Sequence, residues 1–325
     1  MKRLTTLFAV ILCTTGMVIA QSNTAITTQD GSTNSSTTIQ IGSDNNATVL
    51  QGFGGQTQNG ASATIEQDGI ENEATIKQRA WNNRGNEHTI DQVGTLNEAK
   101  VDAFNGDNLG EITQNGAENY ALMQHGAARD GSGYVTQNGD DNYARLRQYS
   151  GAGNSASITQ GASAYTSNDN DADLKQTGND NSASFSLTWG DENNVTIDQI
   201  GDNNYSEYSV KYGDMNTITA DIEGNNNRTR LNVNTAWGNL SSGNSITVTK
   251  DGDYNWISGK VEGSDNTITL IQDGFGNNIG TSWHTGDGVN ISGDNNTVSI
   301  TQSSDNNSAF TTVIGSNNSA TITQN

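Results

Sequence analysis

The chain has 325 residues, of which only 31% are hydrophobic and 6% aromatic, and its formal charge is −21 from 15 basic and 36 acidic side chains. A globular enzyme normally has about half of its residues apolar, so this composition excludes a conventional round core. Low hydrophobicity with a large net charge is typical of disorder. The chain nevertheless contains no proline, the residue that a continuous sheet excludes. The absence of proline therefore favours an ordered β structure that accommodates 45 asparagines and 37 glycines.

The first 20 residues are typical of a secretory signal peptide. Lys2 and Arg3 precede a mostly apolar segment that ends at Ala20, after which we expect cleavage. The alternative, a transmembrane anchor, is disfavoured because Thr14, Thr15 and Gly16 interrupt an apolar run that is too short to span a membrane.

Removal of the signal leaves an acidic chain without cysteine, because Cys13 is the only one. The mature chain has 13 basic and 36 acidic residues, a charge of −23. Such a surface repels nucleic acid and anionic membranes. We therefore expect a secreted protein with no nucleic-acid partner and no membrane insertion of the mature chain.

An eleven-residue repeat covers the chain from residue 23 onward. It is clearest at Asn72–Gln78, Asn142–Gln148 and Asn318–Gln324, where each row has Asn at position 0, an apolar residue at +4 and Gln at +6. Position +2 is small or apolar. Asn fills position 0 in 23 of 25 rows, with Ala61 and Gly131 as exceptions, and Gln fills +6 in 15 rows. Of the 24 spacings between rows, 15 are eleven residues, so the repeat defines the fold.

The period predicts how the rows fold. Positions 0, +2, +4 and +6 lie on one face of a strand, and Gly-x-x-Asn supplies a tight turn because Gly and Asn tolerate positive φ. One row cannot bury its inner face alone, whereas two consecutive rows folded face to face can. Residues 21–325 are therefore predicted to form an all-β, two-sided parallel β-solenoid of about 12 strand-turn-strand rungs, spaced about 4.8 Å apart in an amyloid-competent cross-β arrangement.

Stacking gives the Asn and Gln positions a structural role. Identical amides can hydrogen-bond to one another along a column, which satisfies polar groups that are costly to bury and fixes the strand register. The predicted amide-column residues are Asn72, Gln78, Asn86, Gln92, Asn108, Gln114, Asn142, Gln148, Asn193, Gln199, Asn266, Gln272, Asn296, Gln302, Asn318 and Gln324. The predicted turn glycines are Gly42, Gly69, Gly94, Gly116, Gly139, Gly178 and Gly201.

Insertions into the period predict where the corners lengthen. With two rows per rung, turns after odd rows lie on one edge and turns after even rows on the other. Extra residues follow the odd rows that start at 45, 72, 119 and 142, and then the even rows that start at 154, 181, 204, 227 and 277. We expect the long corners to switch edges near residues 161–169, which places the corners 52–60 and 236–243 on opposite edges.

Joined rows follow the pattern Gln-x-Gly-x-x-Asn-x-Ala-x-x-x-Gln, as in Gln67–Gln78 and Gln137–Gln148. This pattern closely resembles the curlin repeat, the unit of the subunits of curli fibres. The resemblance implies a bacterial protein that is secreted to the cell surface and polymerises with itself into extracellular amyloid fibres for biofilm matrix, adhesion and cell aggregation. It also implies other curlin-like subunits and an outer-membrane secretion pore as partners.

The chain departs from the family pattern in three ways. It has far more rows than a typical major subunit. The repeat starts almost immediately after the predicted signal, so we expect no separate N-terminal targeting segment. Several late rows also lose Gln at +6, which is replaced by Val210, Ile222, Val233, Val261 and Val313. These departures leave open whether the chain is a major subunit, a nucleator or an accessory component.

No motif indicates an enzyme, and we expect no catalytic residue, metal site or cofactor. The histidines His88, His125 and His284 have no partner at metal-ligand spacing and are interpreted as solvated or incidental. Acidic turns such as Gly139–Asn142 and Gly293–Asn296 could stack into columns of carboxylates that bind calcium, or they are simply solvated turns.

Three tryptophans lie in or beside long corners. There they form either contact patches or simple corner packing. They are Trp81, Trp237 and Trp283.

The alternative function is an ice-binding or surface- or polysaccharide-binding solenoid that acts without polymerisation. Outward threonine pairs such as Thr217 and Thr219 suggest it, but an ice-binding face requires a flat, unbroken threonine array. The equivalent outward positions elsewhere hold Arg145, Arg147, Asp171, Asp173, Arg228 and Arg230. Open strand edges at both ends instead favour stacking into thioflavin-positive fibres with a reflection near 4.7 Å.

Overall fold

The computed structural model describes residues 22–52, 58–79, 85–126, 128–161, 167–233, 242–280 and 288–325. Within these ranges the chain forms strands, turns and bends but no helix, and so no helix that could cross a membrane. The predicted signal peptide, the three corner tryptophans Trp81, Trp237 and Trp283, and His284 lie outside the described residues.

Two parallel sheets make up the described chain. The 13-stranded sheet contains, in spatial order, β1 (Thr24–Gln29), β3 (Asn46–Gln51), β5 (Glu73–Gln78), β7 (Glu98–Ala103), β9 (Tyr120–His125), β11 (Tyr143–Ser150), β13 (Asp171–Thr177), β15 (Asn194–Ile200), β17 (Thr217–Glu223), β19 (Ser245–Asp251), β21 (Thr267–Asp273), β24 (Thr297–Gln302) and β27 (Ser319–Gln324). The 14-stranded sheet contains β2 (Ser35–Ser43), β4 (Ser62–Ile70), β6 (Glu87–Thr95), β8 (Leu109–Ala117), β10 (Ser132–Asn138), β12 (Ser155–Gln160), β14 (Ser182–Trp189), β16 (Tyr205–Tyr212), β18 (Arg228–Val233), β20 (Trp256–Glu262), β22 (Asn278–Ile279), β23 (Val289–Ser292), β25 (Ser308–Ala309) and β26 (Thr311–Ile314).

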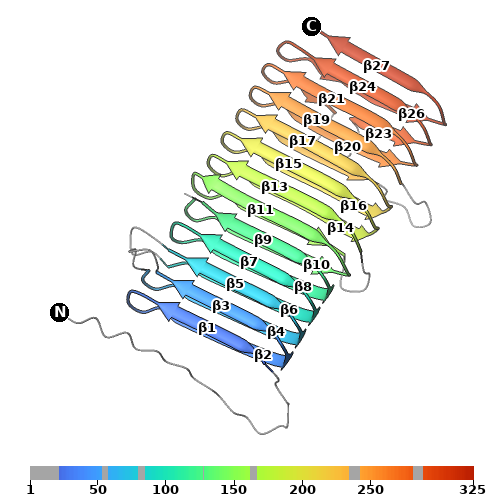
Figure 1. Ribbon diagram of the computed structural model, residues 1–325. Helices are drawn as coiled ribbons and strands as arrows, with labels where there is room; N and C mark the ends of the chain where they lie inside the picture. The colour runs from blue at the N-terminus through green and yellow to red at the C-terminus, as the bar shows by residue number, and fades with distance from the viewer. Residues whose placement is uncertain are drawn as a thin grey trace.

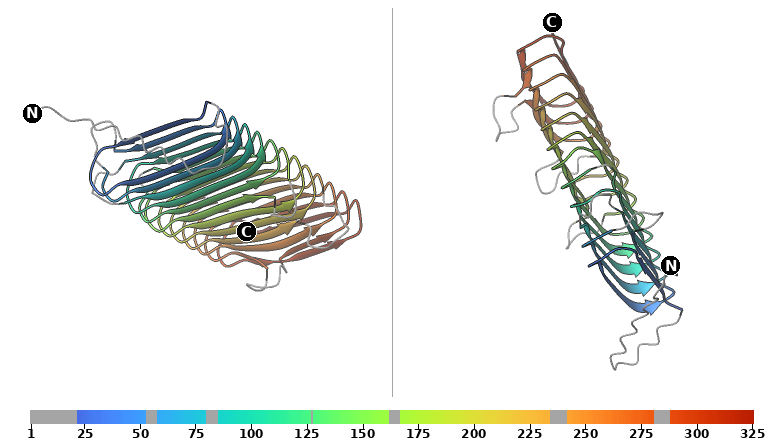
Figure 2. Two further views of the ribbon diagram at one scale, coloured as in Figure 1. Left: turned by 90° about the horizontal axis from the view of Figure 1, so that it is seen from below. Right: turned by 90° about the vertical axis from the view of Figure 1, so that its left-hand side faces the viewer.

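Consecutive rows alternate between the two sheets, so each row stacks on the row two units earlier. Ala74 of β5 lies over Ala47 of β3 and under Ala99 of β7, and all the pairings are parallel. The result is a long, two-layered ladder with the first strands at one end and the last strands at the other (Figures 1 and 2). The prediction of a two-sided parallel β-solenoid of about 12 turns is confirmed.

Alternation along each strand produces a thin core between the sheets. In β5 the side chains of Ala74, Ile76 and Gln78 are buried, while Glu73 and Lys77 are exposed. The small residue at +2 and the aliphatic residue at +4 repeat this pattern in nearly every rung. Because the sheets are close together, one aliphatic side chain per row is enough to fill the interior, which explains the low hydrophobic content.

The tight corners depend on two positive-φ positions. Gly116 has φ of 132° and Glu118 has φ of 57°, and Asn119 follows as position 0 of the next row. The residue before the row Asn, and not that Asn itself, is therefore the second left-handed position, which corrects the sequence interpretation. The row Asn instead points inward and is buried.

The longest insertion interrupts a row instead of lengthening a corner. β22 and β23 both pair with β20, and residues 281–287 between them lie outside the described part of the chain. The row that starts at 277 was predicted to be continuous, but its +4 and +6 places are filled by Val289 and Ile291, because only these side chains resume the inward alternation.

The connections around the other insertions follow the sheet order. β3 leads from the 13-stranded to the 14-stranded sheet across residues 52–61, whereas β18 leads back across residues 234–244. Residues 162–166 are not among those described, and the switch of long corners near 161–169 stays a prediction.

Candidate functional site: the amide columns

Six successive glutamines form an unbroken column in the 14-stranded sheet. Nε2 of each donates to Oε1 of the next, beginning with Gln40 to Gln67 at 2.9 Å and ending with Gln137 to Gln160 at 3.0 Å. The intervening steps are 2.8 to 2.9 Å long and pass through Gln92 and Gln114.

Each of these side chains also joins the two sheets. Gln137 Nε2 donates to the carbonyl of Tyr120 at 3.0 Å and to that of Asn142 at 2.9 Å, both at the start of rows in the opposite sheet. Gln51 makes the equivalent bonds to Ser35 at 2.9 Å and Ala61 at 3.2 Å. The two N–H groups of a glutamine at +6 are therefore shared among three acceptors, the next amide oxygen and two carbonyls of the opposite sheet, and an aliphatic side chain can make none of these bonds.

The glutamine column of the 13-stranded sheet has gaps. Three runs are continuous: Gln29–Gln51–Gln78, Gln148–Gln176–Gln199 and Gln272–Gln302–Gln324, with steps of 2.7 to 3.0 Å. Between them the column contains Ala103, His125, Ile222 and Lys250. Where the column breaks, Gln199 donates to the Ser206 hydroxyl at 2.9 Å instead.

Lys250 occupies a glutamine position with a cationic side chain. It is 1% exposed, and Nζ donates to the carbonyls of Arg228 and, at 3.1 Å, Asn255. These two carbonyls correspond to those that Gln51 reaches. Burial lowers the pKa of Lys250 well below its ordinary value. Oε1 of Gln272, next in the column, is buried without a hydrogen-bond donor.

His88 and His125 are buried neighbours, so the interpretation of these two histidines as solvated is wrong. They are 1% and 0% exposed, and their ring centroids lie 5.4 Å apart. They are buried because both occupy inward positions of the repeat, +2 for His88 and +6 for His125. His88 Nδ1 lies 2.8 Å from Gln78 Nε2.

The histidine pair fits because neighbouring rows contain glycine. A Cβ on Gly110 would lie 2.5 Å from both His88 Cδ2 and Met123 Sδ, and one on Gly131 would lie 3.2 Å from His125 Nδ1. Burial lowers the pKa of His88 well below its usual value, aided by nearby His125. Burial also lowers the pKa of His125 to about 4, and the interaction of the ring with Gln148, which favours the protonated imidazole as donor, opposes this shift.

The asparagine column of the 13-stranded sheet is continuous. Oδ1 of each asparagine accepts the backbone N–H of the next, and in most steps its Nδ2 as well. Asn119 Nδ2, for example, donates to Asn97 Oδ1 at 3.0 Å, while Asn142 Nδ2 donates to Asn119 Oδ1 at 3.0 Å. The same direction holds up to Asn318, whose Nδ2 donates to Asn296 at 3.1 Å.

The asparagine column of the 14-stranded sheet bonds mainly to the backbone. Asn204 Nδ2 donates to the Gly224 carbonyl at 2.7 Å, and its Oδ1 accepts the N–H of Asn227 at 3.0 Å. Ala61 interrupts this column, and the buried Nδ2 of Asn86 above it has no hydrogen-bond partner.

The turn glycines stack on one another. A Cβ on Gly116 would lie 2.0 Å from the Gly139 carbonyl oxygen, so no other residue fits there. The other predicted turn glycines face an equally close carbonyl of the next rung at 1.8 to 2.2 Å; they are Gly42, Gly69, Gly94, Gly139, Gly178 and Gly201.

The acidic turns use their carboxylates as backbone acceptors. Asp140 Oδ1 accepts the N–H of Ala117 at 2.7 Å, and Asp202 Oδ1 accepts that of Asn179 at 2.7 Å. Among the described residues, no group of three or more His, Cys, Asp or Glu could hold a metal ion. The structure therefore assigns these carboxylates a role in corner stacking.

The predicted amide-column residues occupy one continuous interior. Asn318 is exposed and Gln324 half-buried at the open edge of β27. The others are buried; they are Asn72, Gln78, Asn86, Gln92, Asn108, Gln114, Asn142, Gln148, Asn193, Gln199, Asn266, Gln272, Asn296 and Gln302.

An aliphatic column continues the glutamine column of the 14-stranded sheet. Its members are buried. After Gln160 the column consists of Leu187, Val210, Val233, Val261, Ile291 and Val313. Sequence reasoning found four of these substitutions but missed Leu187 and, because of the interrupted row, Ile291.

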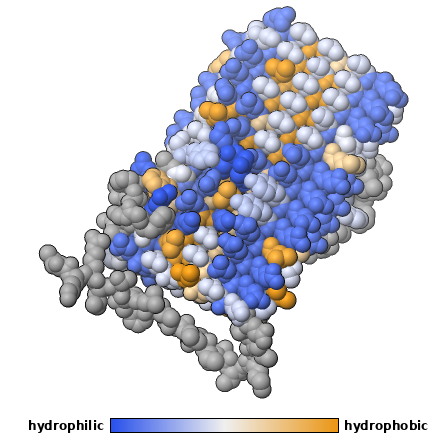
Figure 3. All heavy atoms as spheres, in the orientation of Figure 1, coloured by the Kyte–Doolittle hydropathy of each residue, from blue (hydrophilic) through white to orange (hydrophobic). Residues whose placement is uncertain are grey.

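The outer face of the 13-stranded sheet is rich in threonine and serine near the C-terminus, where residues of intermediate hydropathy form rows (Figure 3). The threonine array covers β17, β19, β21, β24 and β27 in register. It consists of Thr217, Thr219, Ser245, Thr247, Thr249, Thr267, Thr269, Thr297, Ser299, Thr301, Ser319, Thr321 and Thr323.

The charged residues that were expected to break the array lie elsewhere. Arg147 pairs with Asp173 at 2.8 Å on β11 and β13 of the same sheet, before the array begins. Arg228 and Arg230 belong to β18 of the other sheet. The charged residues that the sequence argument named therefore lie outside β17 to β27, but the array is still interrupted there, by Asp221 and Ile271 in register with Thr249.

A comparison with known protein families identifies a repeat in this chain. The curlin associated repeat matches residues 129–161, which include β10, β11 and β12, and residues 293–325, which include β24 to β27. No curated protein matches the chain. With this repeat at two positions in a two-sided β-solenoid, the chain is a curlin-repeat protein.

Proposed function

We propose that this chain is a secreted subunit that stacks end to end into extracellular, curli-type amyloid fibres of a bacterial biofilm. The observation that carries the proposal is the single polarity of the asparagine column. Oδ1 of each asparagine accepts from the next rung, so this column ends with an amide acceptor at Asn318 and begins with amide donors at Asn23. One copy can therefore continue the column of another in the same register.

The backbone groups of the two end strands are complementary as well. N–H groups of Thr297 and Ser303 on and after β24 donate to carbonyls of the following rung at 2.9 and 2.8 Å. The equivalent positions in β27 are Ser319, Thr321 and Thr323, whose N–H groups therefore point to the open edge. β1 is exposed along its whole length and is the surface that these groups would meet.

Family membership supports the biological setting. Curlin-repeat proteins are subunits of fibres that leave the cell through an outer-membrane pore and mediate adhesion and cell aggregation. The predicted signal peptide and the strongly acidic mature chain fit export in a soluble form. Other curlin-like subunits are the expected partners in nucleation, and none of these steps requires a catalytic residue.

The first test is polymerisation of the mature chain, residues 21–325, after removal of denaturant. We expect thioflavin-positive fibres and a reflection near 4.7 Å. A chain that stays monomeric for days at micromolar concentration would refute the proposal.

A directed test blocks the open edge of β27. Thr321→Pro removes one N–H that points away from β24, whereas Thr321→Val keeps it. We expect the proline variant to fail to elongate but to cap wild-type seeds, because its β1 edge is intact. The valine variant should elongate normally. Capping distinguishes a blocked edge from a misfolded chain, and normal growth of the proline variant would contradict this edge assignment.

The threonine array favours a second candidate function, binding of ice or another ordered surface without polymerisation. Its hydroxyl and methyl groups repeat at about 4.8 Å across the strands and about 6.6 Å along them. An ice-recrystallisation assay of freshly prepared monomer tests it, with Thr247→Lys as the variant and Thr64→Lys on the other sheet as the control. Equal activity of the two variants would show that the threonine array is not the ice-binding surface.

A further inference from the structure

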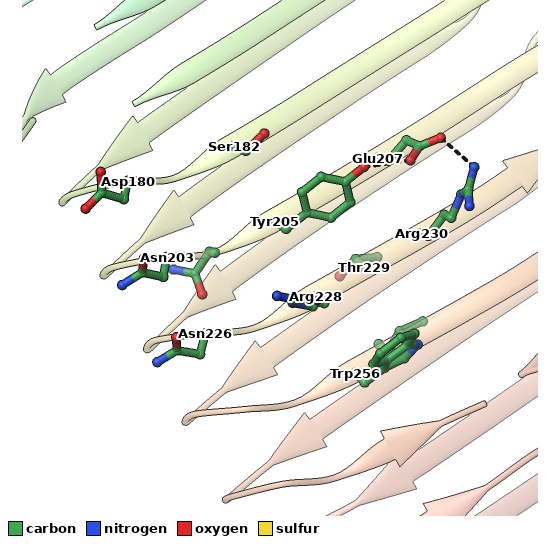
Figure 4. Close-up of a pocket in the computed structure, with 12 residues that line it drawn as sticks. Asp180, Ser182, Asn203, Tyr205, Glu207, Asn226, Arg228, Thr229, Arg230 and Trp256 are labelled. Atoms are coloured by element: carbon green, nitrogen blue, oxygen red, sulfur yellow. Dashed lines mark hydrogen bonds and ion pairs between the residues drawn. The ribbon is translucent and has the colours of Figure 1, made fainter. Parts of the chain in front are cut away.

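A groove lined by Tyr205 and Trp256, called the aromatic groove below, crosses the outer face of the 14-stranded sheet (Figure 4). Its larger part has a volume of about 550 Å³ and lies over the first residues of β14, β16, β18 and β20. This is within the range of small-ligand sites, about 300–1,000 Å³. Tyr205, Arg228 and Trp256 form its floor and walls, and Asp180, Asn203 and Asn226 line it at the corner.

The strand register sets the spacing of the aromatic rings. Tyr205 pairs with Arg228, and Arg228 pairs with Trp256, so the two aromatic residues are two strands apart. Two strand spacings amount to about 9.6 Å, close to the length of a disaccharide unit in an extended polysaccharide.

The groove continues along the solenoid axis. A second hollow of about 340 Å³ shares Asn226, Arg228 and Trp256 with the first and adds Tyr254. Tyr254 is 57% exposed and Phe275 is 48% exposed, and the centroids of their rings lie 5.2 Å apart. The aromatic groove therefore extends over several rungs, which suits a chain-like ligand better than a compact one.

The local charges balance, although the whole chain carries −21. Two carboxylates, Asp180 and Glu207, and two guanidinium groups, Arg228 and Arg230, line the groove. Glu207 is already occupied, since it accepts a hydrogen bond from the Tyr205 hydroxyl at 2.7 Å and pairs with Arg230 at 3.2 Å. A neutral groove on an acidic protein favours an uncharged ligand over an anionic one.

We propose that the aromatic groove binds an uncharged polysaccharide chain that lies along the solenoid axis. Pyranose rings present a flat C–H face that packs on the rings of Tyr205 and Trp256. Their hydroxyl groups meet the amides of Asn203 and Asn226 at the corner. Successive sugar units then match the repeat of the rungs, so that one chain contacts several strands at once.

Another pair of outward aromatic residues provides the matched control. Tyr120 and Tyr143 occupy the same +1 positions on the other sheet, but their rings stack on each other at 5.1 Å with an interplanar angle of 7°. Each of these rings therefore covers one face of the other. Substitution there removes two aromatic side chains without touching the proposed site.

The test measures binding of soluble neutral glucan to freshly prepared monomer and of a labelled cello-oligosaccharide to fibres. Tyr205→Ser with Trp256→Ser should weaken binding about tenfold or more, because each substitution removes one stacking surface. Tyr120→Ser with Tyr143→Ser should change it less than about twofold. Because thioflavin fluorescence is read separately, loss of binding is distinguishable from failure to form fibres.

Two results would overturn the proposal. One is equal binding by the groove variant and the control variant. The other is a preference for polyuronate or single-stranded DNA over neutral glucan that disappears with salt, which would indicate an anion-binding surface around Arg228 and Arg230.

Discussion

Replacement of Lys250 by glutamine is expected to stabilise the solenoid. At Lys250 the glutamine column buries a lysine Nζ among backbone carbonyls. Glutamine at the equivalent place in an earlier rung, Gln51, reaches two carbonyls and the next amide, Gln78, at 2.9 Å. Lys250→Gln should therefore keep the contacts to Arg228 and Asn255 and add one to Gln272.

The magnitude follows from the burial of the lysine. Satisfying Gln272 Oε1 contributes little to the gain, because Oε1 of a glutamine at 250 would face Ile222 and lack a donor in its turn. Burial disfavours the protonated lysine, so its replacement should raise the free energy of unfolding at pH 7 by roughly 1–3 kcal/mol, the cost of an uncompensated buried polar group. Because burial lowers the pKa of Lys250 in the folded state, the unfolded chain binds more protons there. Wild-type stability should therefore rise with pH up to about 10.4, the ordinary lysine value, and the advantage of the variant should shrink.

The assay is urea denaturation of freshly prepared monomer between pH 7 and pH 10. The control is Lys77→Gln, a lysine on the exposed face of β5, which should change neither the midpoint nor its pH dependence. A Lys250→Gln variant that is no more stable than the wild type at pH 7 would refute the reasoning, as would an advantage that is constant with pH.

Three further predictions concern the interior and the corners. Asn119→Ala should lower the free energy of unfolding by roughly 3 kcal/mol, because it orphans the Gly139 carbonyl and two donors of Asn142, while Asn97 Oδ1 keeps only the backbone N–H of residue 119; Asn115→Ala on the exposed surface is the control. Wild-type stability should fall as the pH drops from about 6.5 toward about 4, the folded-state pKa of His125, and His125→Gln should flatten that part of the curve in urea titrations. Gly116→Ala should lower the thermal midpoint far more than Gly60→Ala, since the new Cβ would lie 2.0 Å from a carbonyl oxygen at the first position and 3.8 Å from its nearest neighbour at the second.

The period of the repeat was sufficient to predict the fold because each row contains its own inside-outside pattern. The alternation in β5, with Ala74 and Ile76 inward and Glu73 and Lys77 outward, repeats with little change along the chain. Parallel stacking then follows from the row length, since equivalent residues of alternate rows fall in register. The amide columns were predictable for the same reason.

The misinterpreted features depend on which sheet a residue belongs to and on whether its position in the repeat points inward or outward. His88 and His125 are 37 positions apart, so spacing alone suggests no contact, but both occupy inward positions that the template marks. Arg228 and Arg230 are outward residues of even rows and cannot interrupt a face made of odd rows. The aromatic groove also depends on this assignment, because Tyr205 and Trp256 are neighbours only through β18.

The +6 columns follow one rule, which is that an amide needs an amide neighbour. Gln137 lies inside the glutamine column and donates to Gln160 at 3.0 Å while it accepts from Gln114 at 2.9 Å. Val210 lies inside the aliphatic column between Leu187 and Val233. Gln137→Val should orphan the Gln160 acceptor, and Val210→Gln should bury an amide oxygen with no donor above or below it.

Each exchange should therefore cost about 1–3 kcal/mol in urea denaturation, although glutamine and valine are both common at this position of the chain. If either exchange were neutral, the columns would be a consequence of composition and not a determinant of the stack. If both are costly, a rung is stabilised only by a rung of its own kind, and the same matching would apply between copies, because the first run of the 13-stranded sheet begins with Gln29 and the last one closes with Gln324.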